Sequence, residues 1–254
     1  MEVFIATSPC LRFQHRQDRR EPGHLRAVSA GCVRQMVSDL LVENYIGHLR
    51  KLANRDGLRL SMESYRNPAK DLDVANNVDE PICEFWWPDG NVIFWCVKAM
   101  ASAAHVNGRP IVGGEAFMAE PKERRLAHPA TLKALGDRAF CEGVNRFIVH
   151  RYAMQPWVEQ RRPGMTMGPY GQHYERSTTW WEDSTAWHQY VARCQYMLRQ
   201  GTFVADVLWL QSEEPLMRTW EGLELPGYDY DAISPQAFMK HVGVKRGTLD
   251  LPGR

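Results

Sequence analysis

The stretch Pro110-Ile-Val-Gly-Gly-Glu115-Ala-Phe117 decides the fold class, because an apolar run of strand length ends in a carboxylate. A helical pattern rich in alanine and aromatic residues precedes it at residues 91–105, and Asn107-Gly108 ends that pattern. A second helical pattern follows at residues 129–141, with proline in its first turn and Gly143 just after its end. A strand between two helices at this spacing predicts a parallel β/α unit.

The same alternation continues in both directions along the chain. Apolar positions at helical spacing recur over residues 37–54, and Asp56-Gly57 ends this helix. Thr179 and Glu182 form a candidate capping box for another helix, which runs to Gln200. Four further runs are expected as strands, at residues 58–65, 81–87, 146–152 and 205–210. We therefore predict an α/β fold, and favour a (β/α)8 TIM-type barrel over a doubly wound sheet because reactive side chains fall at strand ends.

Composition and spacing exclude several classes of protein. The chain has 254 residues, of which 44% are hydrophobic and 24% charged, as in folded globular proteins. The net charge of +1 and the absence of a Lys/Arg block argue against a nucleic-acid partner. The sequence contains neither a CxxC pair nor a GxGxxG motif, so it offers no zinc or dinucleotide signature. No apolar run is long enough to span a bilayer, and we expect no membrane partner.

Three apolar runs carry a glutamate, namely Glu63, Glu84 and Glu115. A bare carboxylate among apolar neighbours is costly unless it is paired or functional. Cleavage of a glycosidic bond needs two carboxyl groups, so these three are the candidate catalytic residues. Glu115 is the first choice, since Gly113 and Gly114 leave room for a ligand to approach. For each glutamate the alternative is a structural ion pair with an arginine.

Candidate substrate-binding residues follow the later strands. His150 ends the run at 146–152, where it could bind a sugar hydroxyl, ligate a metal or pack in the core. The chain has nine tryptophans, and aromatic faces pack against the C–H faces of sugar rings as well as in ordinary cores. The substrate-binding candidates are His150, Trp157, His173, Arg176, Trp180 and Trp181. Spacing alone assigns no metal ligand.

Eight segments, in order, resemble motifs of the α-L-rhamnosidases of glycoside hydrolase family 106, over about residues 57–251. The longest is Pro163-Gly-Met-Thr-Met-Gly-Pro-Tyr-Gly-Gln-His-Tyr-Glu-Arg-Ser-Thr-Thr-Trp-Trp181. The others are Asp79-Glu-Pro-Ile-Cys-Glu-Phe-Trp86, Ser102-Ala-Ala-His105, Gly114-Glu-Ala-Phe117, His150-Arg-Tyr-Ala-Met-Gln-Pro-Trp157, Trp187-His-Gln-Tyr-Val-Ala-Arg-Cys-Gln-Tyr196, Phe203-Val-Ala-Asp206 and Gly227-Tyr-Asp-Tyr-Asp231.

The resemblance implies an inverting hydrolase that removes terminal α-L-rhamnose from polysaccharides or glycosides. It also implies a (β/α)8 barrel with accessory β-domains, a calcium ion that holds the rhamnose, and a rhamnose-containing glycan or glycoside as the partner. Glu115, Glu84 and Glu63 fall on acidic motif positions. Two of them are expected as general acid and general base, and the third as a residue that binds calcium or substrate.

The domain organisation is expected to be partial. We expect a loose, disordered leader at residues 1–34, part of the catalytic barrel at 35–201, and the truncated start of a following domain at 202–254. A further polypeptide segment would then complete the barrel. The start of the chain lacks the features of a signal peptide, whereas members of the resembled family are usually exported, so the localisation stays open.

Two alternative functions stay open beside hydrolysis. The first is an inactive, truncated barrel that binds carbohydrate through its tryptophans. The second is a metal-dependent lyase or isomerase on the same barrel, which would need a complete His/Glu/Asp metal site. The sequence displays only parts of such a site.

Overall fold

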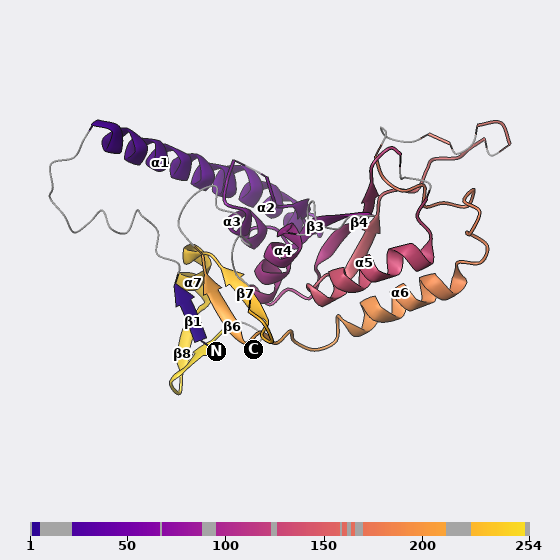
Figure 1. The fold of residues 1–254 in the computed structure, drawn as a ribbon. Helices are drawn as coiled ribbons and strands as arrows, with labels where there is room; N and C mark the ends of the chain where they lie inside the picture. Colours follow the sequence, from indigo (N-terminus) through magenta and orange to yellow (C-terminus); the bar gives the residue numbers. More distant parts are fainter. Residues whose placement is uncertain are drawn as a thin grey trace. The chain divides into compact units, whose positions relative to one another are not determined.

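The computed structural model describes residues 2–5, 22–66, 68–87, 95–122, 126–157, 159–161, 164–165, 170–211 and 225–251. The chain divides into two compact units, which are described one at a time (Figure 1). The first unit comprises Met1–Pro81, Lys98–Pro110 and Thr202–Arg254, and the second comprises Ile82–Val97 and Ile111–Gly201. The units change between Gly201 and Thr202, where a boundary was expected, but the first unit combines Met1–Pro81 and Thr202–Arg254 from the two ends of the chain.

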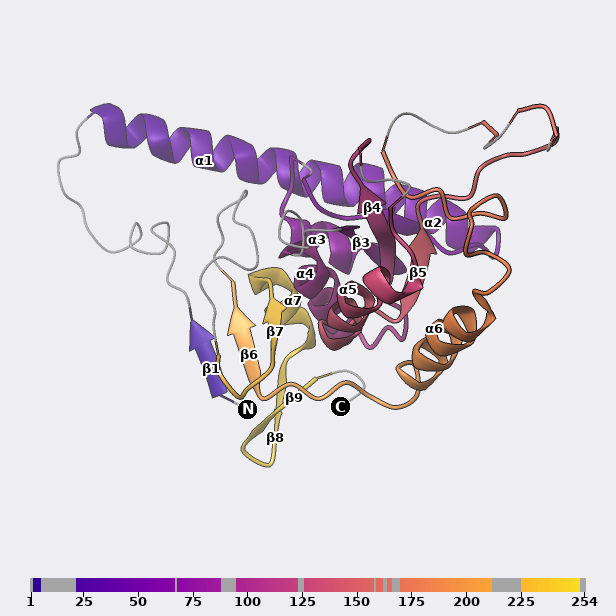
Figure 2. The same cartoon turned by 45° about the vertical axis from the view of Figure 1, so that its right-hand side comes forward.

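A three-stranded parallel sheet organises one part of the first unit. Its strands lie side by side in the order β1-β6-β7 (Figures 1 and 2), with bounds β1 (Glu2–Ile5), β6 (Val207–Leu210) and β7 (Tyr230–Ile233). The helices α4 (Trp95–Val106) and α7 (Pro235–His241) contribute to its apolar cluster, whose buried members are Val106, Leu208, Ile233, Ala237 and Leu251. The antiparallel pair β8 (Gly243–Lys245) and β9 (Thr248–Asp250) follows.

Helices form the other part of the first unit. They are α1 (Pro22–Leu40), the π-helical turn η2 (Leu41–Ile46), α2 (Gly47–Arg55) and α3 (Asp71–Asn76). Their buried cluster consists of Val42, Ile46, Ala69, Val74 and Val78. The short strand β2 (Ser61–Glu63) follows α2, and the carboxylate of Asp79 accepts a hydrogen bond of 2.9 Å from the backbone N–H of Leu60 just before this strand.

The second unit is a parallel sheet with a crossover helix. Its strands are β3 (Glu80–Trp87), β4 (Gly113–Ala119) and β5 (Arg146–Val149), and the whole sheet has the order β2-β3-β4-β5. The helix α5 (Pro129–Cys141) connects β4 to β5, as parallel pairing requires. The helix α6 (Thr185–Met197) comes after the long segment that follows β5.

Aromatic packing and glycine spacing hold this sheet together. The rings of Phe85, Phe117 and Phe147 contact one another edge to face, with centroids 5.3–5.5 Å apart. A Cβ at Gly114 would lie only 3.0 Å from Val144 and 3.1 Å from Phe85. The glycines before Glu115 therefore allow β4 to pack closely against its neighbours.

The α/β class with parallel sheets is confirmed, whereas a closed barrel is not observed. The described strands form two open parallel sheets and one hairpin. The helix at 129–141 and the helix end at Arg55 match the sequence predictions, while the expected helix start at residue 91 lies outside the described residues. Residues 1–34, where we expected a loose leader, contain β1 and the first part of α1. Within the described ranges no helix is both long and apolar enough to cross a membrane.

The predicted capping box at Thr179 and Glu182 is wrong. The helix α6 begins at Thr185, and residues 179–184 form turns instead. The physical reason is that Trp180 is held outside a helix, since its indole N–H donates a hydrogen bond of 3.1 Å to the carbonyl of Ala127. Tertiary contacts of this kind override a local capping signal.

Candidate active site

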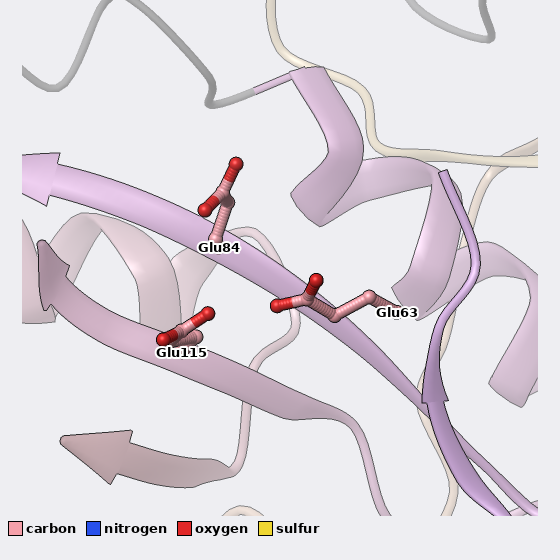
Figure 3. A group of neighbouring side chains, drawn as sticks. All are labelled: Glu63, Glu84 and Glu115. Atoms are coloured by element: carbon pink, nitrogen blue, oxygen red, sulfur yellow. The ribbon is translucent and has the colours of Figure 1, made fainter. Parts of the chain in front are cut away.

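The register of two parallel strands brings Glu84 and Glu115 side by side. Glu84 on β3 and Glu115 on β4 are direct partners across the ladder, and both side chains are half-buried. Partner residues on paired strands point to the same face of the sheet, and adjacent strands lie about 4.8 Å apart. Closeness of these two carboxylates is therefore a consequence of strand pairing (Figure 3).

Glu63, the last residue of β2, joins this pair. One carboxylate oxygen from each of Glu63, Glu84 and Glu115 lies within 4.8 Å of the others (Figure 3). All three candidate catalytic residues thus gather in one group, called the carboxylate trio below. Carboxylates this close repel one another when all are ionised, and a hard cation with oxygen ligands would relieve that repulsion.

The spacing within the carboxylate trio bears on mechanism. Inverting glycosidases hold their two carboxyl groups about 6.5–9.5 Å apart to leave room for a water molecule. The oxygen-to-oxygen separations of at most 4.8 Å are shorter than that. An inverting acid and base drawn from the Glu84 and Glu115 pair alone would lack that room.

His150 lies beside Glu115. Its Nε2 atom is 3.7 Å from Oε1 of Glu115, and its side chain is 14% exposed. The residue directly follows β5, and its backbone N–H donates a hydrogen bond of 3.4 Å to the carbonyl of Ala116 on β4. The end of β5 lies beside the middle of β4, because Val149 pairs with Ala116, and His150 therefore reaches Glu115 although Glu115 is not at the end of its strand.

A glycine fixes the space around His150. Gly171 has a φ of +94°, and a Cβ built there would lie 2.1 Å from Nδ1 of His150. The next residue, Gln172, donates a backbone hydrogen bond of 2.8 Å to the carbonyl of His150. The segment around residue 171 therefore covers His150 closely, and only glycine permits that approach.

Arg176 fixes Gln155 of the segment that follows β5. Its Nε donates 3.0 Å to the Gln155 side-chain oxygen, and its Nη2 donates 3.1 Å to the Gln155 carbonyl. The side chain of Gln155 in turn donates to Glu175, which is 1% exposed and also accepts 2.7 Å from the backbone N–H of Ser177. Arg176, a candidate for binding substrate, thus contacts the protein in the described structure.

Trp180 and Trp181 belong to an aromatic cluster around Tyr174. Both are half-buried, and their rings meet Tyr174 edge to face at 5.3 and 5.8 Å. Burial raises the pKa of Tyr174 to about 12, with a smaller opposing effect from the indole of Trp187, and burial lowers the pKa of His188. At neutral pH a protonated Tyr174 can therefore donate its hydroxyl to the neutral His188 ring, 2.7 Å away.

The two remaining candidates differ in accessibility. His173 is 8% exposed, so most of its surface is closed to a ligand. Trp157 is 58% exposed and lines a cavity of about 740 Å³. Of the substrate-binding candidates, Trp157 is therefore the one that offers a large open aromatic face.

Comparison with known proteins identifies the family. A family model described as alpha-L-rhamnosidase, glycoside hydrolase family 106, matches residues 32–254. The chain belongs to glycoside hydrolase family 106. The rhamnosidase from Novosphingobium sp. PP1Y is similar in structure, with a TM-score of 0.78 and 26% identity over 87% of this chain. The structural likeness thus supports the fold of this chain, in addition to the sequence match.

A curated relative adds a different name. A protein of Formosa agariphila that bears the provisional name beta-glucuronidase is 38% identical over 221 residues, or 86% of this chain. The chain spans 18% of the length of that relative and 22% of the length of the solved rhamnosidase. Both are therefore much larger proteins than the segment that they share with this family 106 chain.

Two family-like motifs contact one another inside the first unit. Nδ1 of His105 lies 2.9 Å from Oδ1 of Asp231, which is fully buried. The hydroxyl of Ser102 accepts a hydrogen bond of 3.0 Å from the backbone N–H of Ala232. In this family 106 chain the SAAH and GYDYD motifs thus bind α4 to β7, which is a structural role.

Sequence reasoning missed some residues that shape the site. The network of Gln155 and Glu175 and the open position of Arg161 were not assigned roles. The turn-rich composition of residues 154–171 looks like an ordinary solvated loop, which conceals them. A usable sequence signal was the presence of Gly164 and Gly171, because glycine is the residue that most readily adopts a positive φ. Both glycines do so in the structure, at places where the chain packs tightly on itself.

Proposed function

We propose that this chain is part of a glycoside hydrolase that removes terminal α-L-rhamnose from polysaccharides or glycosides. The observation that carries the proposal is the gathering of Glu84 and Glu115 on neighbouring parallel strands in a family 106 chain. The parallel register of β3, β4 and β5, with a crossover helix between β4 and β5, supports a (β/α)8 barrel as the architecture of the whole enzyme.

Glu115 is the catalytic carboxylate of the trio in this proposal. His150, 3.7 Å away, can orient the Glu115 carboxylate and stabilise its charge when the imidazole is protonated. Glu115 would take a proton from the attacking water as a general base. Inversion needs a second carboxyl group about 6.5–9.5 Å away, so the general acid would lie outside the carboxylate trio.

Glu84 and Glu63 would hold the calcium ion that the family resemblance implies. Three carboxylate oxygens within 4.8 Å of one another fit a hard cation with oxygen ligands. A bound calcium ion would neutralise the clustered charge and offer coordination positions to sugar hydroxyl oxygens. The carboxylates themselves then orient the sugar, which keeps Glu115 beside the carbon that reacts.

Two observations favour alternatives. The short separation within the carboxylate trio is closer to the separation of about 5–5.5 Å in retaining glycosidases, which supports a covalent glycosyl-enzyme intermediate over inversion. The name of the Formosa agariphila relative supports a glucuronide as the substrate instead of a rhamnoside. The substrate alternative makes a distinct prediction in a hydrolysis assay.

The test is hydrolysis of a chromogenic aryl α-L-rhamnoside and of the matching aryl β-D-glucuronide by the purified chain with calcium. We expect rhamnoside hydrolysis that is lost in Glu115→Gln and kept in Glu182→Gln, an exposed matched control. Glucuronide hydrolysis alone would reverse the substrate assignment. A folded chain that hydrolyses neither compound would overturn the catalytic proposal for this chain.

A further inference from the structure

A separate cavity lies in the segment that follows His150. It has a volume of about 740 Å³, and its lining residues all come from one stretch: Met154, Gln155, Pro156, Trp157, Gln160, Arg161, Gly164 and Met165. Small-molecule sites range from about 300 to 1,000 Å³, so the size suits a sugar. The stretch begins four residues after His150, and so it belongs to the carboxyl-end edge of the parallel strands.

Backbone bonds give this cavity a defined frame. Met154 and Met165 pair as an isolated antiparallel bridge, with backbone hydrogen bonds of 3.2 and 2.9 Å. Gly164 closes the turn at a φ of +102°, where a Cβ would lie 2.4 Å from the carbonyl oxygen of Met154. The backbone at Met154, Gly164 and Met165 is therefore held in place before a ligand arrives.

One wall of the cavity is apolar and exposed. Trp157 is 58% exposed, and Met154 and Met165 are 57% and 63% exposed. An open indole face beside flexible thioethers is suited to the C–H face of a sugar ring. Leaving these side chains in water has a free-energy cost that such a ligand would recover.

The polar lining residues of the cavity are Gln155, Gln160 and Arg161. Gln155 is already engaged by Arg176 and Glu175, so its amide serves the frame. Gln160 and Arg161 are exposed, and Arg161 is the single charged member among the described lining residues. Within the described ranges, its guanidinium has no ion pair and no hydrogen bond. The described lining residues therefore carry one positive charge, and the N–H groups of Arg161 are available to a ligand.

We propose that this cavity binds an anionic sugar unit of the glycan, with the ring on Trp157 and the anion on Arg161. The guanidinium offers two parallel N–H donors, which match a uronate carboxylate or a sulfate ester. The inference deepens the proposed function, since it rests on a carbohydrate substrate and adds that an acidic sugar accompanies the residue that is cleaved.

The test is a calorimetric titration of the purified chain with three sugars that share one ring. They are methyl β-D-glucopyranoside, methyl β-D-glucuronopyranoside and the 6-sulfate of the glucoside. We expect an acidic sugar to bind about tenfold more tightly than the neutral one, as one charge-assisted pair allows. The tighter of the two acidic ligands identifies the anion as carboxylate or sulfate.

Variants distinguish the contribution of the Arg161 charge to binding from that of the Trp157 ring. Arg161→Gln is expected to abolish the preference for acidic sugars, Trp157→Ala to weaken all three ligands, and Arg193→Gln on exposed α6 to change nothing. Equal binding of neutral and acidic sugars, or a preference that survives Arg161→Gln, would overturn the proposal. The titration needs no hydrolysis. Binding of acidic sugars by a chain without rhamnosidase activity would therefore support this proposal and contradict only the catalytic proposal.

Discussion

The Nε2 atom of His150, which directly follows β5, lies 3.7 Å from Oε1 of Glu115 on β4. Pairing of β4 with β5 produces this proximity, because Ala116, next to Glu115, is the ladder partner of Val149, next to His150. Gly171 then fixes the other side of the imidazole. A strand register and one glycine thus determine the surroundings of the candidate catalytic carboxylate.

The first prediction concerns Gly171→Ala. The new methyl group would meet Nδ1 of His150 at 2.1 Å, in a backbone conformation with φ +94°. We expect His150 to be displaced and rhamnoside hydrolysis to fall by about 100-fold, the loss that a misplacement of about 1 Å can cause. Thermal unfolding and hydrolysis are measured together, so that misfolding is recognised.

The matched control for this glycine is Gly201→Ala. Gly201 also has a positive φ, +81°, but a Cβ there would meet no atom within 4 Å. It therefore experiences the backbone strain of about 1–2 kcal/mol without the clash. Equal losses of activity in the two variants would show that strain alone matters and that His150 has no special role.

The second prediction concerns Asp79→Asn, because Asp79 binds the backbone just before β2. Burial alone would raise the pKa of Asp79, but hydrogen bonds from Leu60, Asn54 and Arg50 and the charge of Arg50 outweigh it and lower the pKa. A lowered folded-state pKa contributes stability that is present above the unfolded value and lost as the pH falls through the folded one. The variant should therefore lose about 1–3 kcal/mol of unfolding free energy at neutral pH.

The measurement is urea unfolding of the parent chain and Asp79→Asn from neutral pH to below about pH 4, the ordinary carboxyl range. The difference between the two proteins should shrink as the solution becomes acidic. Asp56→Asn serves as the control, because Asp56 is an exposed carboxylate paired only with its neighbour Arg55 in the described contacts. A difference that stays constant with pH would rule out the ionised Asp79 as the cause.

The third prediction concerns Asp73→Asn, for which we expect a gain in unfolding free energy instead of a loss. Asp73 is 3% exposed, and burial raises its pKa, with a smaller opposing hydrogen bond from Ser234. A raised folded-state pKa contributes stability below the unfolded value that is lost as the pH rises through the folded one. Asp73→Asn should therefore gain about 1–3 kcal/mol at neutral pH, the cost of burying an imperfectly paired polar group.

Stability curves against pH check this prediction. The gain of Asp73→Asn over the parent should disappear in acid, where the parent carboxyl is already neutral. Asp73→Asn and Asp79→Asn should then diverge in opposite directions between acid and neutral pH, although both residues belong to the first unit. A loss of stability at neutral pH in Asp73→Asn would mean that the carboxylate has a partner that it needs.

The sequence by itself determined the local elements and the residue types at the strand ends. Helix α5 begins at a proline and ends before Gly143, and both signals act within one turn of the helix. Glu63 and His150 lie at strand ends as predicted, because a short apolar run followed by a polar residue is readable without tertiary information. The predicted strand ends at Glu84 and Glu115 are wrong, since β3 continues to Trp87 and β4 to Ala119. The ordered family motifs likewise predicted the membership of family 106 that the family model confirms.

Only the tertiary structure decided how these residues meet. The register that opposes Glu84 to Glu115, 31 residues later in the chain, depends on which strands pair, and no local pattern encodes it. The same is true of the contact between Arg176 and Gln155, and of the bond from Trp180 to Ala127, which lies where the helix start was predicted. Side-chain spacing is a property of a few neighbouring residues, whereas contacts between distant segments arise from packing the whole chain.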